Sequence, residues 1–185
     1  MGLDMYLNKK TYVKNWSHMK KGEKVKITIS GNKEKIKNIN TKKVTYIEEE
    51  VAYWRKANQI HNWFIKNCGD NDFMARSISI NDEKLEELLK TIILVLKDSK
   101  LVKGKINNGY TFNKDGKKEE ILIDGKYIKD STTAQKLLPT SEGFFFGSTD
   151  YDEYYIQQLK YTKKVLENLL KENNSMSEYY YEASW

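Results

Sequence analysis

The stretch GKINNGYTFNKDGKKEEILIDGKYIK, residues 104–129, decides the fold class. It carries the turn signals NNG, KDG and IDG, and between them lie short runs in which apolar and polar residues alternate. Asn-Gly and Asp-Gly favour the backbone of tight turns between antiparallel strands, and alternation is typical of a half-buried strand. The stretch therefore predicts a β-hairpin or a small three-stranded meander.

Outward from this stretch, hydrophobic periodicity predicts the remaining elements. The expected strands cover 3–7, 23–30, 43–50 and the aromatic end 177–185. The expected helices cover 49–67, 81–99, 132–138 and 151–172. Asn81 is the expected N-cap of the second helix, and Pro139 ends the third. Because strands and helices are segregated, we predict a single α+β domain over residues 1–185, with a mostly antiparallel sheet packed with about three main helices.

Composition restricts the class of protein. Hydrophobic residues make up 39% of the 185 and charged residues 31%, as in a soluble globular domain. Cys68 is the only cysteine and His18 and His61 are the only histidines, which excludes a disulfide framework and a zinc site rich in cysteine or histidine. We expect no metal and no cofactor. A cytoplasmic protein without membrane association is expected, since neither a secretory leader nor a run of about 20 apolar residues is present.

The net charge of +6 would suit a nucleic acid or a phosphate ligand. The cations are nearly all lysines at spread positions, and Arg55 and Arg76 are the only arginines. Base reading and bidentate phosphate contacts favour arginine. A lysine-coated, solvated surface is therefore the preferred interpretation, and nucleic-acid binding is disfavoured.

The first candidate site is YWRKANQIHNWF, residues 53–64. On the expected helix, Asn58 lies between apolar positions and should face inward, where a buried amide needs hydrogen-bond partners. In one interpretation Asn58 and His61 bond neighbouring backbone and hold the helix against the sheet. In the other they form a pocket wall, in which Trp54 stacks on a flat ring while Arg55, Asn58 and His61 supply polar contacts.

The second candidate site is GFFFGSTDYDEYY, residues 143–155, which suggests a buried strand joined at a glycine to a helix. Ser148 or Thr149 would cap this helix, and Asp150 and Asp152 suit its first turn. The alternative is a ligand site that uses Ser148, Thr149, Asp150 or Tyr151. Neither a P-loop nor a dinucleotide fingerprint is present.

Enzymatic activity is left open but is the less favoured interpretation. His61 could act as a general base oriented by Asp4, Asp150 or Asp152. The GxSxG and HExxH motifs are both missing, and Cys68 falls on an apolar helix face, as a core thiol does.

Four strings together carry a resemblance: MGLDMYL (1–7), YWRKANQIHNWF (53–64), LLPTSEGFFFGSTDYDEYY (137–155) and YYYEASW (179–185). With the hairpin NGYTF…DGKYI, they resemble an uncharacterised family of small proteins encoded by bacteriophages and prophages. The resemblance covers most of the chain and implies residence in a bacterial cytoplasm during infection. It implies no established activity.

Resemblance and residue types together suggest interference with host defence. The expectation is a binding protein that sequesters a nucleotide-derived small molecule without catalysis. The expected ligand-binding residues are Trp54, Arg55, Asn58, His61, Ser148, Thr149, Tyr151, Trp185 and Asp4. One alternative is an inhibitor that docks on a host or defence protein through the aromatics Trp16, Trp63 and Tyr179–Tyr181; another is a nucleotide hydrolase. The oligomeric state is open, with a homo-oligomer allowed.

Overall fold

The computed structural model describes residues 2–69, 77–143, 145–172 and 177–185. The strands are β1 (Asp4–Tyr12), β2 (Tyr46–Arg55), β3 (Ile78–Ile80), β4 (Leu101–Phe112), β5 (Lys118–Ile128) and β6 (Ser177–Ser184). The α-helices are α1 (Lys33–Ile36), α2 (Asn58–Cys68), α3 (Asp82–Asp98), α4 (Thr132–Leu137) and α5 (Glu153–Leu169). Two single-turn 3-10 helices, η1 (Lys21–Glu23) and η2 (Thr41–Lys43), complete the elements.

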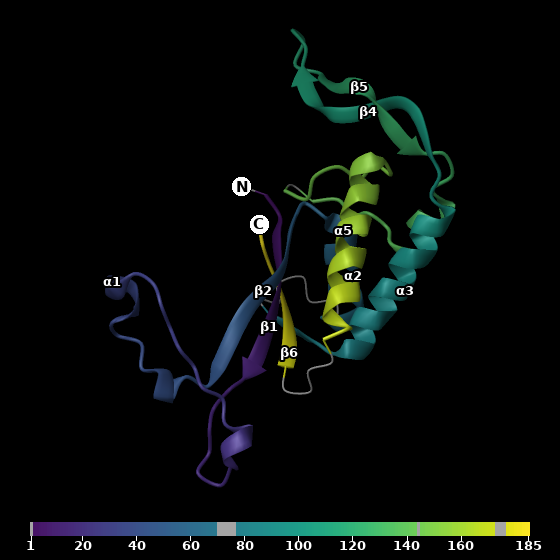
Figure 1. Cartoon of the computed structure of the whole chain (residues 1–185). Coiled ribbons are helices and arrows are strands. Elements are labelled where there is room, and N and C mark those ends of the chain that lie inside the picture. The colour runs from purple at the N-terminus through teal and green to yellow at the C-terminus, as the bar shows by residue number, and fades with distance from the viewer. Residues whose placement is uncertain (1, 70–76, 144, 173–176) are drawn as a thin grey trace.

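The main sheet has four antiparallel strands in the order β2-β1-β6-β3. Strand β1 lies inside it and pairs Met5 with Trp54 of β2 and Leu7 with Tyr181 of β6. The alternating side chains of β1 are buried on one face only, which is the pattern of a sheet covered on a single side. The N- and C-terminal strands are therefore neighbours (Figure 1).

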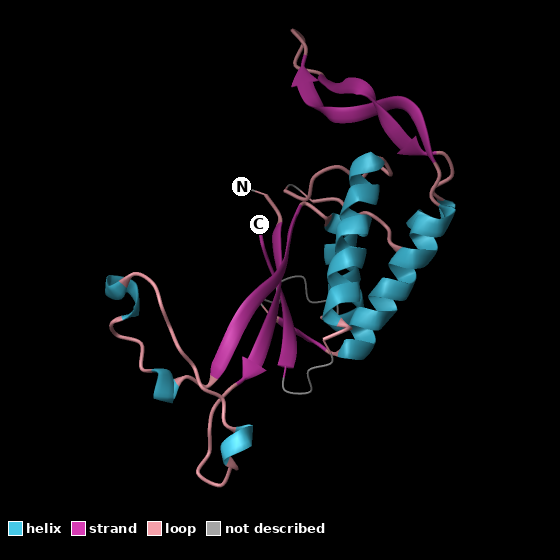
Figure 2. Cartoon of the chain, in the orientation of Figure 1, coloured by secondary structure: helices cyan, strands magenta, loops and turns pink. Residues whose placement is uncertain are grey.

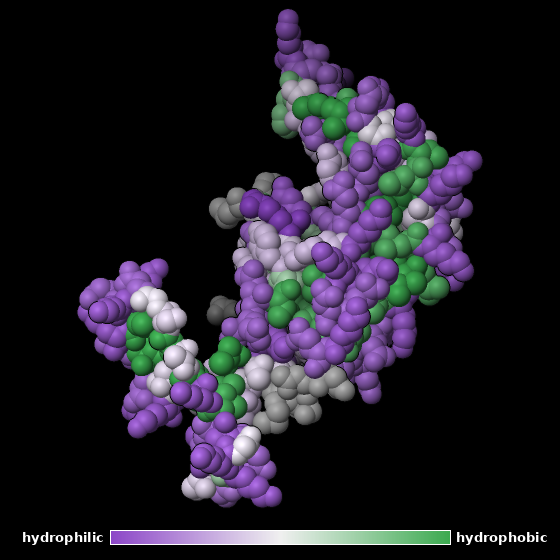
Figure 3. All heavy atoms as spheres, viewed as in Figure 1, coloured by the Kyte–Doolittle hydropathy of each residue, from purple (hydrophilic) through white to green (hydrophobic). Residues whose placement is uncertain are grey.

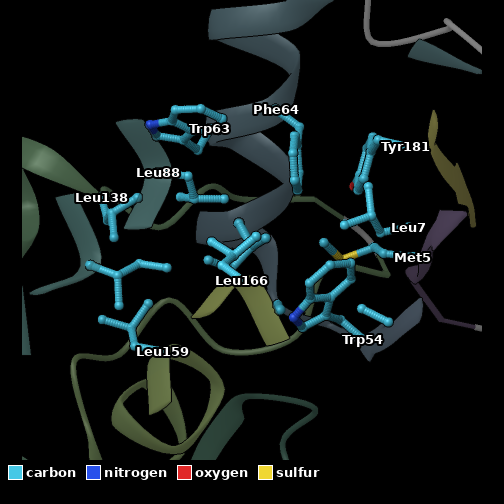
Figure 4. Close-up of a cluster of buried hydrophobic side chains, with 14 of the residues drawn as sticks. Met5, Leu7, Trp54, Trp63, Phe64, Leu88, Leu138, Leu159, Leu166 and Tyr181 are labelled. Atoms are coloured by element: carbon cyan, nitrogen blue, oxygen red, sulfur yellow. The ribbon is translucent and has the colours of Figure 1, made fainter. Parts of the chain in front are cut away.

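Helices α2, α3 and α5 lie on one side of the sheet and cover its buried face (Figure 2). Helix α3 buries one stripe at the i, i+3, i+4 spacing, formed by Leu85, Leu88, Ile92 and Val95. The core between helices and sheet is aromatic, with Phe64 of α2 stacked on Tyr181 of β6 at a ring distance of 4.3 Å (Figure 4). The α+β class, the antiparallel sheet and the three main helices are confirmed.

Strands β4 and β5 form a separate two-stranded hairpin that extends beyond the body (Figure 1). The prediction for residues 104–129 is confirmed in its hairpin form. Aromatic and aliphatic side chains cover the two cross-strand glycines, since a Cβ at Gly104 would meet the Tyr127 ring and one at Gly125 would meet Ile106. The base of the hairpin is anchored to the body where the Ile128 N–H donates to the Tyr151 carbonyl at 2.8 Å.

Two expectations near the N-terminus are wrong. Residues 23–30 alternate like a strand but pair with no strand in the described parts of the chain. The helix expected from residue 49 starts only at Asn58, because β2 continues to Arg55 along β1. Its β-branched and aromatic residues favour a strand, and their helical spacing was coincidental.

The segment 143–155 also differs from its prediction. Residues 143 and 145–149 form a loop rather than a buried strand. Helix α5 is capped by Asp152, not by Ser148 or Thr149, because the Asp152 carboxylate accepts hydrogen bonds from the N–H groups of Tyr154 and Tyr155. No helix in the described ranges is long and apolar enough to span a bilayer.

Candidate functional site

The two candidate segments meet at a three-way junction. The Lys56 N–H donates to the Leu3 carbonyl at 2.7 Å, and the Leu3 N–H donates to the Phe145 carbonyl at 3.1 Å. Lys56 adopts a left-handed backbone with φ of 59°, which is costly for a residue with a side chain. Gly147, with φ of 89°, packs so closely that a Cβ there would lie 3.0 Å from the Lys56 Cβ. The junction therefore needs glycine at 147.

The Asn58 side chain stabilises this junction through three hydrogen bonds to backbone groups. Its Nδ2 donates to the carbonyls of Phe146 (3.0 Å) and Ser148 (2.8 Å), and its Oδ1 accepts from the Ser141 N–H (3.0 Å). Asn58 is buried. Of the two interpretations left open, the backbone-bonding one describes Asn58, and its amide has no donor left for a ligand.

His61 lies on the same helix, three residues after Asn58, and its side chain is fully buried. Its Nδ1 is 2.7 Å from the Tyr181 hydroxyl, and its ring packs edge-on to Phe146 and Trp185. Burial lowers the pKa of His61 to about 4 from an ordinary 6.5, so the imidazole is neutral at neutral pH. A fully buried ring cannot contact a ligand on the surface, and the same burial removes it as a general base for one.

Trp54 and Arg55 lie on opposite faces because they are neighbours on a strand, not on a helix. Trp54 points into the core (Figure 4), where its Nε1 donates to the Thr162 hydroxyl at 2.8 Å. The Arg55 guanidinium is exposed and 4.0 Å from an Asp4 carboxylate oxygen. Trp54 is thus not available as a stacking surface, whereas Arg55 is exposed beside Asp4 and can reach a ligand.

A groove runs between the hairpin and the loop residues 140–143 and 145–150, with the junction as its floor. A narrower part of about 390 Å³ and a wider part of about 810 Å³ adjoin and share Lys56, Asn107, Gly109, Gly147 and Ser148. The narrower part adds Arg55, Gln59, Asn108, Thr140, Asp150, Asp152, Tyr154, Tyr155 and Gln158. The wider part adds Tyr110, Lys118, Glu142, Gly143, Phe145 and Thr149.

Unusual backbone is concentrated along this groove. Three of the five described residues with positive φ angles line it, namely Lys56, Gly109 and Gly147, and Lys56 alone among them carries a side chain and hence a strain cost; β4 also has a bulge between Asn107 and Tyr110. Strained backbone and bulges cluster at functional sites, because the surrounding structure must hold them against their cost. This concentration marks the groove as the candidate site.

The groove is polar and of mixed charge. Its cations are Arg55, Lys56 and Lys118, and the Lys118 ammonium lies 3.5 Å from the centre of the Tyr110 ring. Tyr110 and Tyr154 expose about half of their surface at its edge. Rings and cations side by side can hold a flat, anionic ligand.

Three acidic residues line the groove, and two of them, Asp150 and Asp152, already have partners; the third, Glu142, lines its wider part. The Ser148 hydroxyl donates to the Asp150 carboxylate at 2.8 Å and accepts from the Asp150 N–H at 3.0 Å. Burial raises the pKa of Asp152, whose carboxylate caps α5. In the described ranges, no group of three or more His, Cys, Asp or Glu side chains could hold a metal ion.

Of the expected site residues, the structure brings Arg55, Ser148 and Thr149 to the groove, with Asp4 beside Arg55. Trp54, Asn58 and His61 lie behind its wall, and Trp185 packs on His61 outside it. Tyr151 lines an adjoining hollow between the hairpin and the body, which shares Asn107, Asp150 and Asp152 with the groove, and its hydroxyl accepts from the Thr140 N–H.

Several groove residues were missed by sequence reasoning. They are Lys56, Gln59, Asn107, Gly109, Tyr110, Lys118, Tyr154 and Gln158. The NNG signal at 107–109 predicted a turn, but in the structure it marks the bulge that forms one wall of the groove.

Comparison of the chain with protein-family models, curated proteins and solved structures finds no match.

Proposed function

We propose that this protein binds a small, anionic, nucleotide-like molecule in the groove and does not turn it over. The observation that carries the proposal is the joint presence of three cations, Arg55, Lys56 and Lys118, and two exposed tyrosine rings in one groove. The narrower part alone, at about 390 Å³, is within the size range of small-molecule sites, roughly 300–1,000 Å³.

Each group has a role that suits such a ligand. The cations meet phosphate oxygens, and Tyr110 or Tyr154 stacks on a base. Asn107 presents an amide to the edge of the base, while Gln59 and Gln158 bond each other at 2.7 Å along the inner wall. This arrangement replaces the expected set, in which Trp54, Asn58 and His61 made the contacts.

The chemistry of the acidic residues supports binding without turnover. A general acid or base must reach the reacting atoms with a free proton-transfer group. Asp150 is held in a turn by Ser148, and Asp152 caps α5. With the resemblance to phage-encoded proteins, this supports a role in which the protein sequesters a nucleotide-derived signal of host defence in the bacterial cytoplasm.

Calorimetric titration with cyclic di- and trinucleotides, ADP-ribose derivatives and NAD tests the proposal. We expect one of them to bind, and expect Lys118→Gln and Tyr110→Ala to weaken binding. Lys114→Gln and Phe112→Ala are the matched controls, since both sit on the same hairpin outside the groove. Absence of binding by a folded protein, or equal losses in controls and groove variants, would overturn the proposal.

Turnover separates binding from hydrolysis. Mass spectrometry of the ligand after incubation should recover it unchanged; product that disappears with Asp152→Ala would establish the hydrolase alternative instead. The inhibitor alternative loses most of its expected surface, because Trp63, Tyr179 and Tyr181 are buried. Trp16 remains exposed, and a stoichiometric protein partner in a pull-down with no bound small molecule would favour that alternative.

A further inference from the structure

Residues 13–45 leave the main sheet between β1 and β2 and project as a lobe (Figure 1). A backbone hydrogen bond of 2.9 Å, from the Val13 N–H to the Thr45 carbonyl, closes the lobe at its neck. The structure describes every residue of the lobe, and Val13 is the only buried one. A segment of this length without a core contributes little to the stability of the body, so its presence calls for another explanation.

Charge is strongly segregated into this lobe. It contains ten lysines and two glutamates, with no arginine or aspartate, and so carries +8. The whole chain carries +6, which leaves a net charge of −2 on the residues outside the lobe. The ten lysines are Lys14, Lys20, Lys21, Lys24, Lys26, Lys33, Lys35, Lys37, Lys42 and Lys43.

Most of these cations have no anionic partner. Lys37 pairs with Glu34 at 2.5 Å, and this is the only ion pair that a lobe lysine makes among the described residues. The other acid, Glu23, accepts a hydrogen bond from the Lys20 backbone N–H instead. Nine of the ten lysines are exposed, Lys14 alone being half-buried, and hydrophilic side chains cover much of the lobe in Figure 3. A surface of this kind attracts a polyanion.

Three aromatic rings lie together at the neck of the lobe. The Trp16 Nε1 donates to the Tyr12 hydroxyl at 2.7 Å, and the Tyr12 ring packs edge-on to Tyr46 at 5.3 Å. Trp16 is 45% exposed and Tyr46 is 48% exposed. The Lys14 ammonium lies 4.3 Å from the centre of the Trp16 ring, so a cation and a flat ring are offered side by side. Exposed rings beside unpaired cations are the elements of a stacking platform for unpaired bases.

We propose that the lobe binds single-stranded nucleic acid without sequence preference. The lysines contact the phosphates, and bases stack on Trp16 and Tyr46. Lysine acts as a point charge toward phosphate, and the absence of arginine from the lobe fits binding that reads no base edges. The lysines of the chain are not evenly spread, as the prediction against nucleic acid assumed, because ten of them belong to one lobe.

Two other polyanions fit the lobe less well. Stable membrane-surface binding needs an apolar element, such as an amphipathic helix, in addition to a basic patch, and the longest helix of the lobe, α1, has four residues. Acidic protein surfaces are gripped best by the bidentate guanidinium of arginine, which the lobe lacks. Neither class needs the exposed rings at the neck.

Fluorescence anisotropy with a labelled oligothymidylate of about 16 nucleotides tests the proposal on the full chain. We expect binding that weakens on the order of 100-fold between about 50 mM and about 200 mM salt, for roughly five phosphate contacts. The quadruple variant Lys20→Gln, Lys21→Gln, Lys24→Gln and Lys26→Gln should weaken binding at least tenfold and lower the salt slope. The matched control changes four exposed lysines outside the lobe to glutamine, namely Lys97, Lys136, Lys160 and Lys171. It should weaken binding much less.

The stacking half of the proposal has its own variants. Trp16→Ala should weaken binding roughly tenfold, within the range measured for base stacking. Trp16→Phe keeps a ring and should stay near the wild type, as should Phe112→Ala on the distant hairpin. Equal loss in Trp16→Phe and Trp16→Ala overturns the stacking role.

Competing polyanions decide the class of partner. Single strands should bind more tightly than a duplex of equal length, because paired bases cannot stack on the rings. Tighter binding to polyglutamate, to phosphatidylserine vesicles or to duplex would overturn the proposal, and so would equal losses in the quadruple variant and its control. These results are independent of the groove, whose test variants lie on the hairpin.

Discussion

Asn15 in the lobe and Asn58 in the body each use their side-chain amide to hydrogen-bond the backbone of another segment. In the lobe, the Asn15 side chain donates to the Val25 carbonyl at 2.7 Å and accepts from the Val25 N–H at 2.8 Å. In the body, Asn58 bonds the carbonyls of Phe146 and Ser148 and the N–H of Ser141. The first amide is exposed to water and the second is buried. The same interaction therefore has a different weight, because only a buried group has no water to replace a lost partner.

The largest expected effect is the loss of stability when the Asn58 side chain is removed, compared with the same change at Asn15. Asn58→Ala leaves the buried Phe146 carbonyl and the partly buried backbone groups of Ser141 and Ser148 without their side-chain partner, and we expect it to lower the free energy of unfolding by about 4 kcal/mol. Asn15→Ala, the matched change in the lobe, should cost at most about 0.5 kcal/mol. Urea unfolding followed by circular dichroism measures both. Similar losses in the two variants would show that the lobe is part of the cooperative unit.

The second prediction concerns the pH dependence of stability that the buried His61 gives to the body. Burial lowers the pKa of His61 to about 4, whereas its ordinary value in an unfolded chain is 6.5. Above pH 6.5 the imidazole is neutral in both states, so it adds no pH dependence. Between pH 6.5 and pH 4 only the unfolded chain takes up the proton, and stability should fall by about 1.4 kcal/mol per pH unit, to a total of about 3 kcal/mol.

Thermal melts across this pH window test the prediction. His61→Gln should flatten the slope in this range, whatever its effect on absolute stability. A slope that survives in His61→Gln would assign the acid sensitivity to other groups.

The third prediction compares a glycine of the body with a glycine of the lobe. Gly147 has φ of 89° and lies against Lys56, whereas Gly31 in the lobe has φ of 144° and no neighbour within 4 Å of an added Cβ. We expect Gly147→Ala to cost about 2 kcal/mol from backbone strain and crowding. Gly31→Ala strains its backbone too, but the strain falls in a coreless lobe and should hardly move global unfolding. Denaturant midpoints decide, and a Gly147→Ala variant as stable as the wild type would show that the junction can relax.

The smallest effect concerns helix caps. Asp152 caps the long helix α5, and Asn32 caps α1 in the lobe, where its side chain accepts from the Glu34 N–H at 2.9 Å. Asp152→Ala should cost about 1 kcal/mol, and Asn32→Ala should cost nothing measurable in global unfolding. Calorimetric melting temperatures resolve this difference; an equal shift for both caps would contradict it.

The sequence predicted the fold where local signals and burial agree. Asn81 caps α3 as expected, its side chain accepting from the Lys84 N–H, and the glycine turns specified the hairpin. The predicted start of the helix at residue 49 was wrong because Tyr53–Phe64 carries both a helical spacing of apolar residues and strand-forming residues. Pairing of β2 with β1 decided between them, and pairing partners distant in the sequence leave no local trace.

Only part of the residues that line the groove was predicted, because long-range packing also decides which segments meet there. Arg55, Ser148 and Thr149 were found because they are polar residues in distinctive strings, and all three line the groove. Tyr110 and Lys118 were missed because nothing in the hairpin sequence says which body segment it will face. Trp54 was misassigned because a strand, unlike a helix, places neighbours on opposite faces.

The position of β6 in the main sheet has a consequence for synthesis. Strand β1 pairs with β6 across more than 160 intervening residues, and β6 also joins β3 to the sheet. Contacts so distant along the chain slow folding, because a very long loop must close before they form. On the ribosome the sheet cannot be completed until residues 177–184 have emerged, so β1 must wait with one edge open while the rest of the chain is made.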